Sequence, residues 1–155
     1  MDYLVVKWVH ILSATFLFGT GLGSAFYMFL ANRRGNIPAI SVVAGHVVIA
    51  DWLFTAPTVV IQPLSGWYLA RKLGLPLSTG WIAWSIALFV LAGACWLPVV
   101  WLQIRMRDIA RAAVAQNAGR LPEIYWRYAR LWTALGIPAF AAMIVVYYLM
   151  VIKPT

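Results

Sequence analysis

The sequence predicts an all-α integral membrane protein, a four-helix bundle with both termini on the outer side of the membrane. Of its 155 residues 64% are hydrophobic and 10% are charged, and the mean hydropathy is +0.85. This composition is typical of integral membrane proteins. Four apolar stretches are each long enough to cross a bilayer as a helix.

The predicted spans form one transmembrane domain over residues 1–155. They cover about 3–30, 41–70, 80–103 and 129–152. The third helix is expected to continue past the membrane as an arginine-bearing extension that stops near Asn117. Pro122 and Glu123 open the last helix, because proline and an acidic residue both suit a first helical turn.

The formal charge of +8 is explained by membrane topology, because the arginines cluster beside the apolar spans. No nucleic-acid partner is therefore expected. The loops between spans one and two and between spans three and four hold eight arginines: Arg33, Arg34, Arg105, Arg107, Arg111, Arg120, Arg127 and Arg130. The opposite side holds Lys7, Arg71, Lys72 and Lys153. The positive-inside rule therefore places these loops in the cytoplasm and both termini outside, as in a protein of the bacterial inner membrane.

A polar face runs along the second span. Its members recur at i, i+4, i+7, i+11 and i+14, which is one side of a helix: Asp51, Thr55, Thr58, Gln62 and Ser65. Lipid cannot hydrogen-bond to these groups, so the face is expected to turn inward, toward other helices, water or a cofactor. The alternative is a helix kinked by Pro57 and Pro63 whose polar atoms only satisfy one another.

The two histidines of the chain are expected at opposite membrane faces. His10 lies inside the first span, at the depth of Gln62 and Ser65 and, by the predicted spans, of Met143. His46 lies near the start of the antiparallel second span, on the order of 25 Å away along the membrane normal. The two therefore cannot bind one iron, and His46 is read as an interfacial histidine without a ligand.

Several short motifs resemble a known family. Lys7 and His10 open the first span as in HemJ-type protoporphyrinogen oxidases, and Thr55-Ala-Pro57 and Gly80-Trp81 fall where that family has similar pieces. The segment 51–66 is most similar to a small four-helix membrane family of unknown function within the wider HemJ/CopD-like group.

This resemblance implies that His10 binds the iron of heme b. Met143 would be the ligand on the other face, Lys7 or Arg71 would pair with a propionate, and Gln62 or Ser65 would fix the imidazole. The protein would then transfer electrons or act as a membrane heme oxidoreductase, and the reaction itself is left open.

Two other functions stay open. One is a non-catalytic subunit or scaffold without a cofactor, and the other is a small proton or cation transporter that uses the polar face at Asp51. The expected surroundings are the lipid bilayer, with a homo-oligomer or a redox partner left open. Cys95 is the single cysteine, so the chain has no intrachain disulfide.

Overall fold

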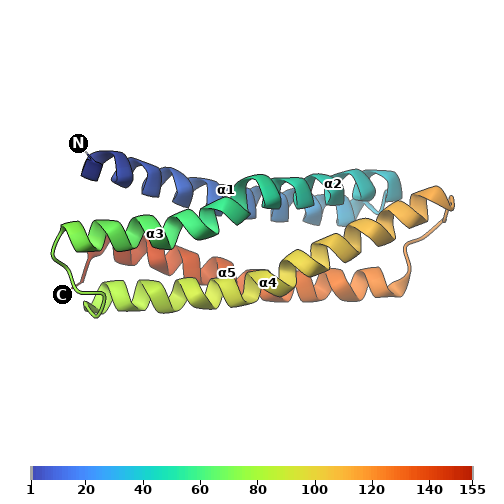
Figure 1. Ribbon diagram of the computed structural model, residues 1–155. Helices are drawn as coiled ribbons and strands as arrows, with labels where there is room; N and C mark the ends of the chain where they lie inside the picture. Colours follow the sequence, from blue (N-terminus) through green and yellow to red (C-terminus); the bar gives the residue numbers. More distant parts are fainter. Residues whose placement is uncertain (1, 155) are drawn as a thin grey trace.

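The computed structural model describes residues 2–154, which contain helices and no strand (Figure 1). Four helical rods are each long and apolar enough to span a membrane. Three of them are single helices: α1 (Asp2–Arg34), α4 (Gly80–Ala115) and α5 (Glu123–Ile152). The second rod joins α2 (Ile37–Ala50), the π-helix η1 (Asp51–Thr55) and α3 (Ala56–Lys72). The predicted all-α, four-helix membrane fold is confirmed.

The rods extend past the predicted membrane spans. The side chain of Asn36 accepts a hydrogen bond from the backbone N–H of Ala39, and this bond starts α2. α4 continues to Ala115, as the expected extension beyond the third span. α5 begins at Glu123, directly after Pro122.

The π-helix η1 has its cause in Pro57. Proline has no backbone N–H, and its ring collides with the carbonyl four residues earlier in an α-helix. The helix widens just before this point, and the N–H of Ala56 bonds to the carbonyl of Asp51, five residues back. α2 packs mainly against α4 and α3 mainly against α1, so the second rod changes its neighbour at η1.

An apolar cluster fills the half of the bundle that holds the α1–α2 and α4–α5 connections. Its members are buried side chains from four helices and the last connection: Met28, Ala31, Ile40, Ala44, Val47, Val99, Leu102, Met106, Ala110, Ala113, Leu121, Tyr125 and Trp132. Tyr125 is fully buried, and its hydroxyl donates to Asn32 Oδ1 at 2.7 Å. This half of the bundle is therefore closed by packed apolar side chains.

Both chain termini lie at the same end of the bundle (Figure 1). We expect this end to face outside, because the arginine-rich connections lie at the other end. A reporter that is active only in the cytoplasm should be active when inserted at Gly119 and inactive at the C-terminus. Activity at the C-terminus would reverse the orientation.

Candidate functional site

Most of the buried polar side chains gather in one region of the bundle. Among residues 2–154 eight polar residues are buried: Ser13, Asp51, Thr55, Thr58, Gln62, Ser65, Ser85 and Gln103. Ser85 is separate from the others, and its hydroxyl bonds to the Trp81 carbonyl of its own helix. Five of the eight are the polar face of the second rod, which thus lies inside the bundle, where its sequence period places it. Ser13 adds to the face from α1 and Gln103 from α4. The array runs from mid-bundle toward the end with the termini.

The mid-bundle part is a hydrogen-bonded network around Asp51. Trp96 Nε1 donates to Asp51 Oδ2 at 3.2 Å. The Gln103 amide, in the orientation that pairs both of its atoms, donates to the same Oδ2 at 2.9 Å and accepts from Trp132 Nε1 at 3.2 Å. Asp51 is thereby tied to both α4 and α5 at the π-helix.

Asp51 differs from the other three acidic residues of the chain. Asp2, Asp108 and Glu123 are exposed, whereas Asp51 is 5% exposed. The ion pair found among residues 2–154 joins Arg107 to Asp108, so within this part of the chain Asp51 has no basic partner. An ionisable side chain inside a membrane bundle is a functional-site candidate, because burying its charge is costly.

The Thr55 hydroxyl, one helical turn after Asp51, is fully buried and makes no close hydrogen bond to a described residue, and the Asp51 carboxyl group is a polar neighbour within reach of a weak one. Buried hydroxyls normally find a partner, so this one is an exception that calls for a reason. Thr58 is satisfied differently: its hydroxyl donates to the backbone carbonyls of Phe54 and Thr55, both at 2.8 Å. The face therefore carries one hydroxyl without a close hydrogen bond next to the carboxyl group.

The second polar contact joins α1 to α3 near the end with the termini. His10 Nδ1 lies 2.7 Å from Ser65 Oγ, and His10 Nε2 lies 3.4 Å from the Gln62 amide nitrogen. Ser13 donates a hydrogen bond to Gln62 Oε1. A Cβ on Gly66 would lie 3.3 Å from His10 Cε1, so a glycine is what lets the imidazole lie this close to α3.

The bonds around Ser65 fix the tautomer of His10. Ser65 Oγ donates its only proton to the carbonyl of Ile61 at 2.6 Å. It must therefore accept from His10, which places the ring proton on Nδ1 and a lone pair on Nε2. The Gln62 amide, whose oxygen accepts from Ser13, can donate to this lone pair.

Three predicted site residues lie outside these contacts. Lys7 and Arg71 are exposed at the end with the termini, and the Arg71 guanidinium lies 5.5 Å from the centre of the Trp67 ring. Met143 packs in an apolar cluster with Leu17 and Phe18. The expectation that Met143 lies at the depth of His10 is wrong: seven residues of α1 separate His10 from Leu17, or roughly 10 Å.

Sequence reasoning missed four members of the site: Ser13, Trp96, Gln103 and Trp132. From the sequence, Trp96 is interpreted as a residue that packs between helices, and Gln103 as the end of the third span. A glutamine in an apolar helix was the available signal, since a buried amide needs partners. Its partners were not predictable, because sequence spacing does not tell which helix faces which.

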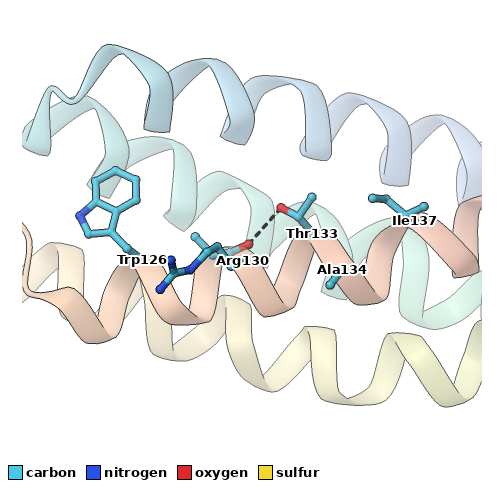
Figure 2. A pocket seen from close by; sticks show the side chains of 6 residues that line it. Trp126, Arg130, Thr133, Ala134 and Ile137 are labelled. Atoms are coloured by element: carbon cyan, nitrogen blue, oxygen red, sulfur yellow. Dashed lines mark hydrogen bonds between the residues drawn. The ribbon is translucent and has the colours of Figure 1, made fainter.

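A shallow groove of about 540 Å³ on the surface is lined by α5 alone and does not join the polar array. Figure 2 shows Trp126, Arg130, Thr133 and Ile137 along it, with the Thr133 hydroxyl bonded to a backbone carbonyl of its own helix, that of Ala129. Since one helix lines it and its hydroxyl is already paired, this groove is not the candidate site.

A family model described as "Predicted integral membrane protein (DUF2269)" matches residues 4–154. The chain belongs to this family. No curated protein and no solved structure matches it. The DUF2269 description agrees with the four spanning rods and states no activity, so the function has to be argued from the site.

For heme b, the group that the resemblance implies, His10 fits in one respect. An Nδ1–H held by Ser65 leaves Nε2 as the ligating atom. The Gln62 amide now occupies the position in front of Nε2 and would have to turn away. Within residues 2–154 no three His, Cys, Asp or Glu side chains come together, so a metal in this part of the chain would depend on fewer such ligands.

Proposed function

We propose that this protein is a small proton transporter whose proton is carried by Asp51. The observation that carries the proposal is a single buried carboxyl group without a basic partner among residues 2–154, at the π-helix in the middle of a spanning rod. Single π-turns inside α-helices frequently occur at functional sites. Asp51 takes up a proton in one state of the bundle and releases it in another.

The polar array supplies a path to Asp51 from the end with the termini. His10, Ser13 and Gln62 lie at its outer part, and the hydroxyls of Thr58 and Thr55 lie between Gln62 and Asp51. Imidazole and hydroxyl groups can each accept one proton and pass on another, as a relay requires, whereas the Gln62 amide holds His10 and Ser13 in place. The Thr55 hydroxyl, which makes no close hydrogen bond, is the last group before the carboxyl.

The other half of the bundle is closed by the apolar cluster, so Asp51 exchanges protons with one side in this state. Transport then requires a second state in which the closed half opens. η1 is the hinge for that change, because the second rod changes its packing partner there, from α4 to α1. Movement of α2 against α4 would open the closed half while α3 keeps its contact with α1.

Proton movement into liposomes that contain the purified protein tests this function. A pH-sensitive dye inside the vesicles should report uptake with the wild-type protein and none with the Asp51→Asn variant. Equal rates in the two preparations, or no uptake in either, would refute the proposal.

Heme b at His10 is a second candidate, favoured by the tautomer that Ser65 imposes and by the resemblance to HemJ-type proteins. Heme would supply one-electron chemistry, and the exposed Lys7 and Arg71 lie at the same end for its propionates. Because Met143 lies about two helical turns deeper, this candidate rests on His10 and not on a His/Met pair.

Absorption spectroscopy decides the heme candidate. Protein made with ample heme should show a Soret band, His10→Ala should abolish the band, and His46→Ala should leave it nearly unchanged. Circular dichroism should show that the His10→Ala protein is still helical. A wild-type protein without the band would eliminate heme and leave the proton proposal standing.

A further inference from the structure

A groove on the outer surface of the bundle lies between α1 and α2, apart from the polar array. It has a volume of about 480 Å³, and its lining is mostly apolar. α1 contributes Gly23 and Tyr27, α2 contributes His46, and η1 contributes Phe54. Pockets for small molecules commonly have this size and a few polar groups of this kind.

His46 is the unexpected residue of this groove. It lies nine residues inside α2, roughly 14 Å from the start of that helix, and it is exposed. Among residues 2–154 the His46 side chain makes no hydrogen bond, in contrast to that of His10. An exposed imidazole with no hydrogen-bond partner among residues 2–154 has its ring nitrogens available to a bound molecule. A molecule in the groove that carries a hydrogen-bonding group would engage one of them.

The walls of the groove suit a flat ring. Phe54 stacks on Phe16, with the ring centres 5.8 Å apart. A Cβ on Gly23 would meet no atom within 4 Å, so the α1 side of the groove is open at this position. Aromatic rings prefer such offset stacking and edge contacts with other rings.

We propose that this groove binds a lipid-soluble ring compound that bears a carbonyl oxygen, of the quinone class. His46 donates a hydrogen bond to the carbonyl, Phe54 and Tyr27 contact the ring, and the apolar tail lies along α1 and α2 toward the lipid. An acyl chain of a phospholipid would leave His46 unpaired. This inference is independent of the proton proposal, since it uses none of the residues assigned to the proton path.

Binding of a short-tailed ubiquinone analogue to the full-length protein in lipid nanodiscs tests the inference. Saturable binding is expected for the wild type. His46→Leu should weaken it about tenfold, the effect of losing about one hydrogen bond, and His46→Gln should restore part of the loss. Gly23→Leu should block binding by filling the groove, whereas Gly93→Leu, at another open glycine on α4, should not.

Three results would overturn the inference. The first is non-saturable binding, or equal binding by the wild-type, His46→Leu and Gly23→Leu proteins. The second is a wild-type dimer that Gly23→Leu dissociates, which would make a second copy the occupant. The third is a Soret band that His46→Leu removes, which would make the occupant heme. The binding assay works whether or not Asp51 moves protons, so the two proposals fail separately.

Discussion

The Asp51→Asn variant is expected to insert and fold as the wild type and to lose proton movement completely. Asparagine has the same shape, and its carbonyl oxygen can still accept from Trp96 and Gln103. It cannot bind and release a proton, so transport should fall to the rate of empty vesicles. Dye-loaded liposomes measure the rate, and infrared spectroscopy follows the carboxyl group itself.

The infrared measurement is simple in this protein because the chain has only four acidic residues. The C=O stretch of a protonated carboxyl group in the apolar bundle should be present in the wild type and absent in Asp51→Asn. Asp108→Asn is the matched control, since Asp108 is exposed and paired with Arg107. If Asp108→Asn removes the transport and Asp51→Asn does not, the buried carboxyl group is not the carrier.

Helical periodicity predicted the polar face of the second rod correctly, because in α3 the period depends only on backbone geometry that every α-helix shares, and the single π-turn at Asp51–Thr55 does not move Asp51 off that face. All five predicted members are buried. The contact of His10 with Gln62 and Ser65 also followed from counting residues along two antiparallel helices. Such counting works here because the connection between α1 and α2 is short, and it therefore fixes the axial position of the two rods.

The same counting failed for Met143. Its depth depends on three connections and on how far α4 and α5 extend beyond the membrane, and each adds its own error. Phe18 of α1 stacks on Phe140 of α5 with the ring centres 4.4 Å apart, and this contact sets the axial position of the two helices. Aromatic contacts between distant segments leave no periodic signal in the sequence.

The π-helix was only half predictable. The sequence shows that Pro57 interrupts the backbone hydrogen bonds, and both a kink and a widened turn would relieve the collision. The choice between them depends on neighbours: Trp96 and Gln103 of α4 bond to Asp51 and hold it toward α4 at the start of η1. Tertiary contacts, which local sequence does not show, thus favour the observed form.

Replacing Gly66 by leucine is expected to separate α1 from α3 near His10. A Cβ alone would lie 3.3 Å from His10 Cε1, so alanine should need only a small shift and have a small effect. The larger leucine side chain cannot fit without displacing the imidazole, and overpacking of this kind costs about 1–3 kcal/mol. Thermal unfolding in detergent should show a lower midpoint for leucine than for alanine.

The displaced imidazole would also lose Ser65 and Gln62, so Gly66→Leu should slow proton movement while Asp51 stays intact. Gly19→Leu, on the same helix as His10, is the control, because a Cβ at Gly19 would meet no atom within 4 Å. His10→Ala in the Gly66→Leu background separates the two effects. It should recover stability, since the clash is gone, but not the rate, since the relay still lacks its imidazole. Recovery of both would show that His10 only fills space and that protons reach Asp51 by another route.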